Sequence, residues 1–337
     1  MAPAALLDPP PLPPPLLPRI LVPEKLSPEG LALLRSTGFQ VDTPAPPLSA
    51  SDLLAQIPSY HALIVRSETK VTAAVLAAGT KLRVVARAGV GVDNIDVDAA
   101  TQHGVIVVNS PSGNILAAAE HTIALLMATA RNVGRADAGM KAGKWERGKL
   151  VGVEGGLGMR VMVFDPYASE AVAKEIGVQL RGELGGLLPE VDFLTVHTPL
   201  LASTANLVGE KELRGMKKTA RVLNVARGGV YNEEALLTAL EEGWIAGAGL
   251  DVFTTEPPVE GSVAARLAAH PKVVSTPHLG ASTVEAAENV SMDVCTQVVE
   301  ILKGGLPTAA VNAPLILPEE YRRLQPFVKL IERMGSL

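Results

Sequence analysis

The chain has 337 residues, of which 47% are hydrophobic and 19% charged, so it is long enough for two domains with buried cores. Its formal net charge of −5 provides no basic surface, which argues against nucleic acid as the main partner. A single cysteine, Cys295, excludes an internal disulfide framework in this chain and fits a reducing compartment.

The first 18 residues are mostly Pro, Ala and Leu, which is typical of a disordered or polyproline lead-in. They lack the Arg and Ser enrichment of a transit peptide and the charged start of a secretory signal. We therefore expect a cytoplasmic protein or one of an organelle stroma, such as that of a plastid, and not a secreted one. The longest apolar run, around residues 123–130, is too short for a membrane span, so no membrane partner is predicted.

From residue 19 onward short apolar strands alternate with helices, which predicts doubly wound parallel sheets. The first half contains predicted strands at residues 19–24, 61–67, 82–89 and 105–110, and predicted helices at residues 27–38, 72–80 and 113–131. The second half contains predicted strands at residues 159–169, 191–200, 221–229, 246–253 and 272–280, and predicted helices at residues 233–244 and 282–304.

Two loops that follow strands in the first half could hold an anion. Arg66 and Lys70 in the first loop would suit a phosphate-bearing acid. Gly89 and Gly91 in the second loop let backbone N–H groups approach an anion closely. On position alone, two surface turns with salt-bridged cations are the simpler interpretation.

The helix predicted at residues 113–131 carries an adjacent Glu120 and His121. A second His four residues away and a third ligand are both missing, so we predict no metal site. We interpret the pair as polar groups at a domain or subunit contact. The following residues, 132–154, are interpreted as a polar connection in which Trp145 is the only large anchor.

Three residues in the second half carry the strongest chemical signal: Arg227 in NVARGG, Glu256 in DVFTTEPP and His278 in PHLG. Arg suits a carboxylate or a polarised carbonyl, and His is well placed to move a proton near neutral pH. A Glu bonded to the other ring nitrogen would fix the tautomer of that His. Taken singly, the three read more simply as a solvated Arg, an exposed loop Glu and a capping His. Together, each after a short apolar run, they predict a catalytic set at the ends of parallel strands.

These motifs resemble those of the D-isomer-specific 2-hydroxyacid dehydrogenase family over roughly residues 19–312. The resemblance implies catalytic roles for Arg227, Glu256 and His278, NAD as cofactor, a small phosphorylated 2-hydroxy acid as substrate, and a homodimer or homotetramer. The RSETKV loop resembles the branch of the family that oxidises 3-phospho-D-glycerate to 3-phosphohydroxypyruvate, the entry to serine synthesis.

The resemblance also implies an α/β fold with two doubly wound parallel-sheet domains. A flavodoxin-like substrate domain is expected at residues 19–104 and 283–312, and a Rossmann NAD-binding domain at residues 105–282. Residues 313–337 resemble the truncated start of a C-terminal regulatory region.

Binding residues follow from the same resemblance. Cofactor contacts are implied for Thr72, Asp165, Thr198, Val225, Ala226, Asp251, Gly280 and Ala281. Substrate contacts are implied for Arg66, Ser67, Lys70, Gly89, Val90 and Gly91. Asp165 would bind the ribose hydroxyls and favour NAD over NADP, because a 2′-phosphate would meet a carboxylate. Thr198 belongs to the loop that lines the nicotinamide side.

The chain departs from this family between Glu154 and Val161, where only the six residues GGLGMR are present. The family has a strand, a glycine-rich turn GxGxxG and a helix here, and a βαβ crossover takes about 30 residues or more. Gly155, Gly156 and Gly158 stand too close to Asp165 for the dinucleotide fingerprint. We therefore predict a Rossmann domain without its first strand, turn and helix, with raw edges on the neighbouring strands and weak NAD affinity.

Two alternative functions stay open at this point. The first is a relative that acts on glyoxylate or hydroxypyruvate, against which Arg66 and Lys70 argue mildly. The second is a catalytically inactive relative that dimerises with an intact subunit or acts as a scaffold. The missing glycine-rich turn supports this second alternative, and the intact set of Arg227, Glu256 and His278 argues against it.

Overall fold

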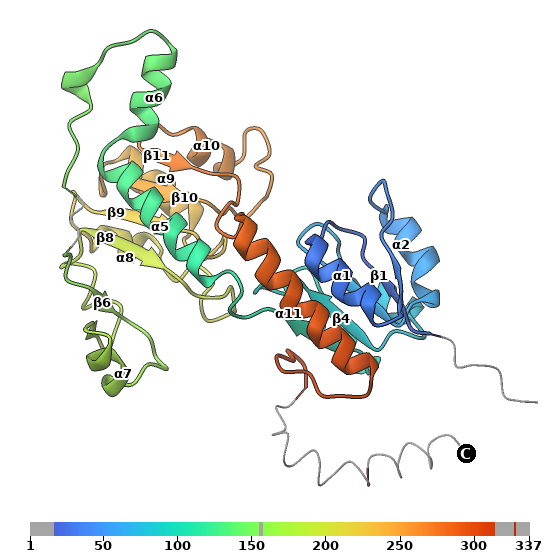
Figure 1. The fold of residues 1–337 in the computed structure, drawn as a ribbon. Helices are drawn as coiled ribbons and strands as arrows, with labels where there is room; N and C mark the ends of the chain where they lie inside the picture. The colour runs from blue at the N-terminus through green and yellow to red at the C-terminus, as the bar shows by residue number, and fades with distance from the viewer. Residues whose placement is uncertain (1–16, 155–157, 314–326, 328–337) are drawn as a thin grey trace, which may run out of the picture. The chain divides into compact units, whose positions relative to one another are not determined.

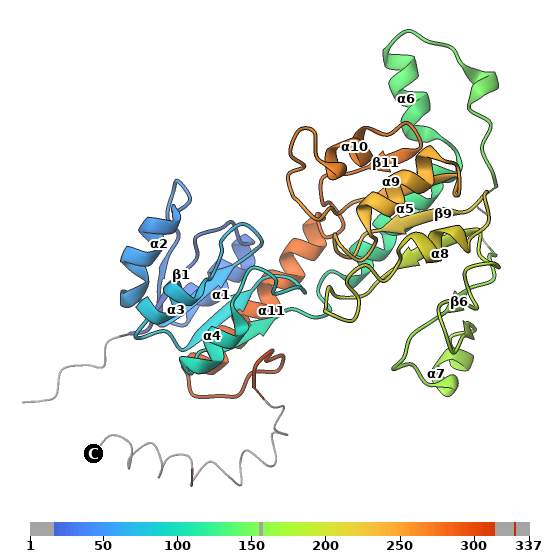
Figure 2. The same ribbon diagram turned by 180° about the vertical axis from the view of Figure 1, so that it is seen from behind.

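The computed structural model describes residues 17–154, 158–313 and 327, and the chain divides into two compact units. The first unit comprises Met1–Asn114 and Val284–Leu337, and the second comprises Ile115–Thr283. Figure 1 and Figure 2 show the elements of each unit from opposite sides. The expected lead-in and the expected C-terminal regulatory region lie almost wholly outside the described residues.

The first unit contains a five-stranded parallel sheet with the strand order β2-β1-β3-β4-β5. Its strands are β1 (Arg19–Leu21), β2 (Gln40–Asp42), β3 (Ala62–Val65), β4 (Val84–Arg87) and β5 (Ile106–Asn109). This order is that of flavodoxin-like doubly wound folds, so the fold expected for this unit is confirmed.

Helices cover both faces of this sheet. They are α1 (Pro28–Ser36) and α11 (Val284–Leu302) on one face, and α2 (Ala50–Gln56), α3 (Ala73–Ala78) and α4 (Val97–Gln102) on the other, with the 3-10 turn η1 (Ile57–Ser59) after α2. Successive strand side chains enter the two cores in turn, because side chains alternate between the faces of a strand. Ile64 packs with the α1 and α11 side, whereas Leu63 and Val65 pack with the other.

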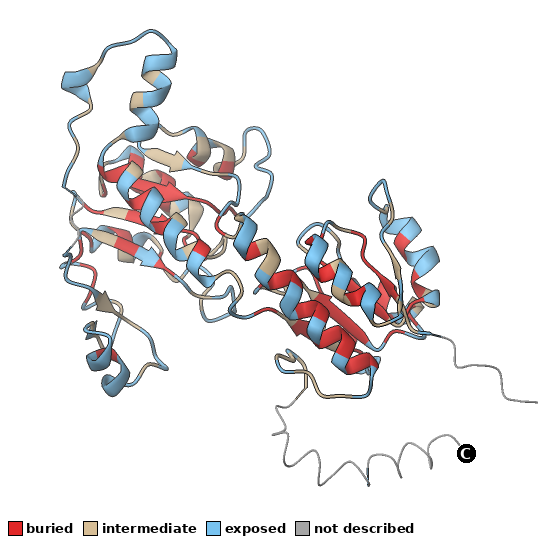
Figure 3. Cartoon of the chain, in the orientation of Figure 1, coloured by how far each residue is buried: buried red, intermediate tan, exposed pale blue. Residues whose placement is uncertain are grey.

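The second unit contains a four-stranded parallel sheet with the order β11-β10-β9-β8. Its strands are β8 (Phe193–Val196), β9 (Arg221–Asn224), β10 (Gly247–Leu250) and β11 (Val273–Ser275). Helix α5 (Ile115–Ala130) packs on one face, and α8 (Glu210–Arg214), α9 (Glu233–Glu241) and α10 (Val263–Ala269) pack on the other. The buried central strands of both sheets are visible in Figure 3.

A separate two-stranded parallel sheet is formed by β6 (Met162–Val163) and β7 (Gln179–Leu180), with α7 (Glu170–Glu175) between them in sequence. Met162 and Phe164 pack against the core of the four-stranded sheet. The described residues between the 3-10 turn η2 (Arg147–Lys149) and β6 form no helix and no strand. The four-stranded sheet therefore ends at β8, which is an edge strand as the sequence predicted.

Two expectations differ from the structure. The strand expected at residues 105–110 as the start of the second domain is β5, and it pairs with β4 in the first unit, which extends to Asn114. Residues 132–154 are not only a connection, because α6 (Val133–Lys141) forms there, and Trp145 is 80% exposed instead of anchored. Helix α6 buries none of its residues in this chain.

The sequence analysis also missed several short elements, namely β2, β7, α2, α4, α7, α8 and α10. The two strands are two or three residues long, which is too short for a recognisable period. In the part of the chain that the structure describes, no helix combines the length and the apolar composition that crossing a membrane requires.

Candidate active site

Three loops at one edge of the four-stranded sheet hold the predicted catalytic residues. Arg227 follows β9, Glu256 follows β10 and His278 follows β11, and these strands are neighbours in the sheet. Because the strands are parallel, their carboxyl ends lie at the same edge, where open α/β sheets place their ligands.

The imidazole of His278 and the carboxylate of Glu256 are in direct contact, with 2.7 Å between Nδ1 and Oε2. The second carboxylate oxygen of Glu256 accepts the backbone N–H of Phe253 at 2.9 Å. Burial raises the pKa of Glu256, but the hydrogen bonds from His278 and Phe253 and the charges of His278 and Arg227 lower it more, so this pKa lies below its ordinary value. An ionised Glu256 keeps a proton on Nδ1 of His278 and leaves Nε2 free to accept another.

The Arg227 loop is shaped by Asn224, which is 3% exposed at the end of β9. Its Nδ2 donates to the Arg227 carbonyl at 2.8 Å, and its Oδ1 accepts the Ala226 N–H at 3.1 Å. Val225 and Ala226, the predicted cofactor contacts, form the turn that Asn224 closes. The sequence analysis missed Asn224, although a polar residue at the end of an apolar strand was a usable signal.

Gly228 lets the loops after β9 and β10 approach each other. A Cβ atom at this position would lie 2.0 Å from the carbonyl carbon of Phe253 and 2.4 Å from the nitrogen of Thr254. No side chain fits there, so Gly228 sets the separation between the loop of Arg227 and the loop of Glu256.

Asp251, at the end of β10, is 1% exposed and binds the loop that carries His278. Its Oδ1 accepts the Leu279 N–H at 2.7 Å, and its Oδ2 accepts the Gly280 N–H at 2.8 Å. The backbone carbonyl of Asp251 accepts the His278 N–H at 2.9 Å. Asp251 and Gly280 were predicted as cofactor contacts, and in the structure they contact each other. Ala281 follows them and is partly buried.

In the first unit, the loop that carries Arg66, Ser67 and Lys70 is held by Glu24. The Glu24 carboxylate accepts the backbone N–H groups of Arg66, Glu68 and Thr69 at 2.9, 3.2 and 3.0 Å. These three backbone donors are therefore not available to an anion, which the side chains of Arg66 and Lys70 could still bind. Ser67 and Lys70 are exposed and Arg66 is partly exposed.

A second clamp on the same loop comes from Asn94, whose Nδ2 donates to the carbonyls of Arg66 and Thr69 at 2.9 and 2.7 Å. The sequence analysis identified neither Glu24 nor Asn94. Thr72, a predicted cofactor contact, is exposed and stands just before α3, without a side-chain capping bond.

The glycine loop after β4 has a backbone that requires glycine. Gly89 has a φ of 146°, and a Cβ atom there would lie 1.6 Å from Nη1 of Arg87. The side chain of Arg87 therefore lies against this glycine. Val90 is 39% exposed and Gly91 is partly buried, and both stay predicted substrate contacts.

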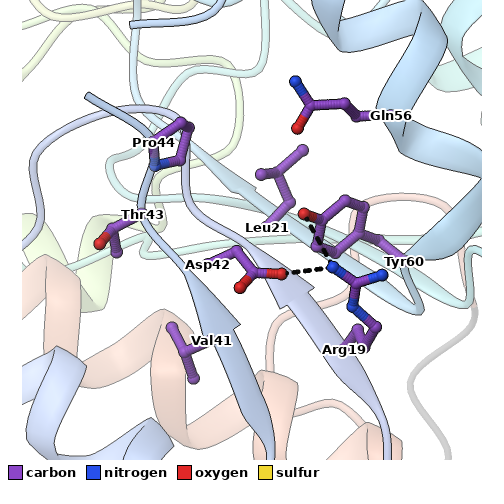
Figure 4. A pocket seen from close by; sticks show the side chains of 8 residues that line it. All are labelled: Arg19, Leu21, Val41, Asp42, Thr43, Pro44, Gln56 and Tyr60. Carbon is purple, nitrogen blue, oxygen red and sulfur yellow. Dashed lines mark hydrogen bonds and ion pairs between the residues drawn. The ribbon is translucent and has the colours of Figure 1, made fainter. Parts of the chain in front are cut away.

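A pocket of about 410 Å³ in the first unit contains none of the predicted site residues (Figure 4). Arg19 in this pocket binds the Asp42 carboxylate at 2.7 Å and lies over the Tyr60 ring, 4.6 Å from its centroid. Its charge is thus already matched by Asp42. This pocket therefore offers no uncompensated cation to a ligand.

Residues 153–280 match the family model described as the D-isomer specific 2-hydroxyacid dehydrogenase, NAD binding domain. The chain is also 47% identical over 313 residues to D-3-phosphoglycerate dehydrogenase 3, chloroplastic, of Arabidopsis thaliana, and this match covers 86% of the chain and 53% of that relative. The chain belongs to the D-isomer-specific 2-hydroxyacid dehydrogenase family.

Two further proteins are similar to most of this chain. D-3-phosphoglycerate dehydrogenase of Synechocystis is 42% identical over 330 residues, which cover 91% of the chain and 58% of that relative. The chain thus spans little more than half the length of these curated relatives. The crystal structure of the TT0316 protein from Thermus thermophilus has 31% identity and a TM-score of 0.78, and covers 87% of this chain and 99% of that one.

The residues that would hold NAD, the cofactor of this family, fit only part of such a molecule. Thr198, after β8, has a buried Oγ1 without a hydrogen-bond partner, which suits a polar group of a ligand. Asp165 is exposed at the end of β6, where its Oδ1 accepts the Tyr167 N–H at 2.8 Å.

The pyrophosphate end of NAD finds no matching cradle among the described residues. Gly155 and Gly156 lie outside them, and no helix opens between Gly158 and β6. A helix N-terminus with glycine N–H groups is what binds a pyrophosphate in a Rossmann domain. Across residues 17–154 and 158–313, no group of three His, Cys, Asp or Glu side chains is placed to hold a metal ion.

Proposed function

We propose that the protein catalyses the NAD-dependent oxidation of 3-phospho-D-glycerate to 3-phosphohydroxypyruvate, the first step of serine biosynthesis. The observation that carries this proposal is the contact of 2.7 Å between Nδ1 of His278 and Oε2 of Glu256, at the strand edge that also holds Arg227. The names of the relatives from Synechocystis and Arabidopsis support the choice of substrate.

In this proposal the residues of the chain remove one proton from the substrate and orient the substrate through its carboxylate. Nε2 of His278 takes the proton of the C2 hydroxyl while Glu256 holds Nδ1–H and stabilises the imidazolium that forms. Arg227 binds the substrate carboxylate and polarises the developing C2 carbonyl. Bound NAD would supply the hydride acceptor for the oxidation at C2.

The loops of the first unit are proposed to bind the substrate. Arg66 and Lys70 would bind the phosphate through their side chains, with Ser67 beside them, and Glu24 already binds the N–H groups of Arg66, Glu68 and Thr69. The backbone of Gly89, Val90 and Gly91 would bind the carboxylate, as the family resemblance implies. Arg66 and Lys70 favour a phosphorylated acid over glyoxylate or hydroxypyruvate.

The test of the reaction is steady-state turnover of the purified chain, with NAD for 3-phospho-D-glycerate and D-lactate and with NADH for glyoxylate and hydroxypyruvate. We expect the phosphorylated acid to give the highest kcat/KM, and we expect Arg66→Gln with Lys70→Gln to abolish that preference. His278→Gln should lower kcat by about 100- to 10,000-fold, the usual contribution of a general base. A preference for glyoxylate or hydroxypyruvate would replace the proposed substrate with that of the alternative enzyme.

Cofactor affinity is proposed to be weak, because the pyrophosphate end has no cradle in the described residues. The measurement is a titration of the chain with NADH, followed by nicotinamide fluorescence, with the folded state checked by circular dichroism. Saturation at micromolar NADH would contradict weak binding. No saturation together with no turnover would leave the second alternative, an inactive dimerising or scaffold relative.

The protein is proposed to form a homodimer or homotetramer. Ile123 on α5 is 52% exposed, Met140 on α6 is 56% exposed and Trp145 is 80% exposed, so apolar groups are available for a subunit contact. Light scattering after size exclusion tests this, and Ile123→Glu should give monomers. The compartment is proposed to be the cytoplasm or a plastid stroma, which tagging of the protein in cells would decide.

A further inference from the structure

We propose that His121 is a positioning residue for the catalytic loop: it fixes Asp251 and Thr276, and through them the backbone of His278. The inference deepens the proposed function and rests on it for its catalytic meaning. It departs from the interpretation of His121 as a polar group at a domain or subunit contact, because its partners lie in its own unit.

His121 extends from α5 toward the ends of β10 and β11. Its Nε2 lies 3.0 Å from Oγ1 of Thr276 and 3.2 Å from Oδ1 of Asp251. Its side chain is 20% exposed, whereas the Asp251 side chain is 0% exposed. The three side chains therefore form one polar cluster beneath the loop of His278.

The hydrogen bonds of this cluster define which nitrogen of His121 carries a proton. The Thr276 hydroxyl donates its only proton to Oδ1 of Asp251 at 2.5 Å, so its oxygen can only accept from His121. Oδ1 of Asp251 can also only accept. Nε2 of His121 must therefore be protonated, since an unprotonated Nε2 would direct its lone pair at two acceptors.

This N–H supports a buried carboxylate. Asp251 accepts hydrogen bonds from Thr276, Leu279 and Gly280, and His121 donates to the Thr276 oxygen while its Nε2 lies 3.2 Å from Oδ1 of Asp251. A buried carboxylate is costly without enough donors, so each one restricts how Asp251 can turn. An Asp251 carboxylate in a fixed orientation in turn holds the N–H groups of Leu279 and Gly280, which follow His278 in the chain.

The backbone of His278 shows why the loop needs such support. Its φ is 56°, in the left-handed region that a non-glycine residue adopts at a cost. The His278 N–H donates to the Asp251 carbonyl at 2.9 Å. With the backbone held in this way, the ring reaches Glu256 at 2.7 Å. Without His121, we expect the loop to sample other conformations and the contact between His278 and Glu256 to be lost part of the time.

The experiment uses the full chain labelled with 15N-histidine, which contains six histidines, with His278 assigned from the spectrum of His278→Gln. In the native protein the His278 ring should show the Nδ1–H tautomer that Glu256 selects. His121→Leu removes the donor at similar volume and should convert His278 to a mixture of tautomers. His121→Gln keeps an N–H donor and should restore the native signature.

The matched control is Glu120→Leu, which places the same new side chain on the neighbouring exposed position of α5. A second pair of variants serves if His121→Leu does not fold. Thr276→Val removes the hydroxyl that joins His121 to Asp251, and Thr276→Ser keeps it. Amide exchange at Leu279 and Gly280 should rise by about tenfold or more in Thr276→Val and in His121→Leu, because the Asp251 carboxylate that accepts both N–H groups loses the Thr276 donor or the residue that holds that donor in place.

These readouts require neither NAD nor turnover, so an inactive chain still tests the positioning role. An unchanged His278 tautomer in His121→Leu, or in Thr276→Val where that variant is the one that folds, would overturn the proposal. If the protein is active, His121→Leu should lower kcat and leave the KM for 3-phospho-D-glycerate unchanged, whereas a general loss of folding would change both.

Discussion

Glu256 is bound from two directions, by the His278 ring and by the Phe253 N–H, and each contact favours its ionised form. Burial raises the pKa of Glu256 and these contacts together with the charges of His278 and Arg227 lower it below its ordinary value. The sequence could nominate Glu256 from its motif, but the depressed pKa depends on partners that only the folded chain supplies.

We expect the contribution of Glu256 to stability to be lost in acid. Its pKa is lower in the folded chain, so the unfolded chain binds more protons and the contribution is complete above the unfolded pKa of about 4.3. It then falls as the pH drops through the folded pKa. Thermal melting of the native chain and of Glu256→Gln should show a difference at pH 7 that disappears toward pH 2. A difference that grows in acid would contradict this.

Between elements, loops from neighbouring strands are packed at backbone contact, and Gly228 is where the loops after β9 and β10 touch. Strand positions follow from apolar runs in the sequence, but the distance between two strand-end loops does not. The same holds for Glu24, which holds a loop that follows it by more than forty residues in sequence. Such contacts join segments that are far apart in the chain, so no pattern within either segment predicts them.

Gly228→Ala should destabilise the second unit by about 3 kcal/mol, the upper part of the usual range for overpacking. The new Cβ would lie 2.0 Å from a backbone carbon, which cannot turn aside as a flexible side chain does. The matched control is Gly182→Ala, where a Cβ meets no atom within 4 Å. Urea unfolding followed by Trp fluorescence measures both. Equal midpoints for the two variants would show that the loops can separate.

Helix α11 provides a second test at this scale through Cys295, the single cysteine of the chain. It is 0% exposed in the core between α1, α11 and the sheet, and burial raises the pKa of its thiol to about 12. Because the thiolate is the reactive form, iodoacetamide at pH 8 should label the folded chain far more slowly than the chain in denaturant. Rapid labelling of the folded chain would show that α1 and α11 open readily.

At the scale of the whole molecule, the second unit has a divided sheet. The four strands from β8 to β11 are continuous, whereas β6 and β7 pair only with each other among the described strands. Edge strands carry unpaired backbone groups, and a short two-stranded pair is marginal by itself. The few residues between Glu154 and Val161 therefore affect both the stability of this unit and the site for the cofactor.

Inserting after Glu154 a strand, a GxGxxG turn and a helix of the kind that the family resemblance implies should join β6 to β8. We expect tighter NADH binding and a higher unfolding midpoint by Trp fluorescence, since both tryptophans, Trp145 and Trp244, lie in the second unit. Labelling of Cys295 in the first unit should not change. A Gly-Ser insertion of equal length is the control. An equal gain from that control would mean that chain length, and not a restored strand and helix, is the cause.

The sequence alone determined the fold class, the order of the main strands and the family, because apolar runs and short motifs are local features. It also brought Arg227, Glu256 and His278 to notice, and they remain the predicted catalytic set. Tertiary structure alone decided that β5 belongs to the first unit, that Glu24 occupies the backbone donors beside Arg66, and that His121 contacts Asp251. These features depend on contacts between residues far apart in sequence, which no local pattern encodes.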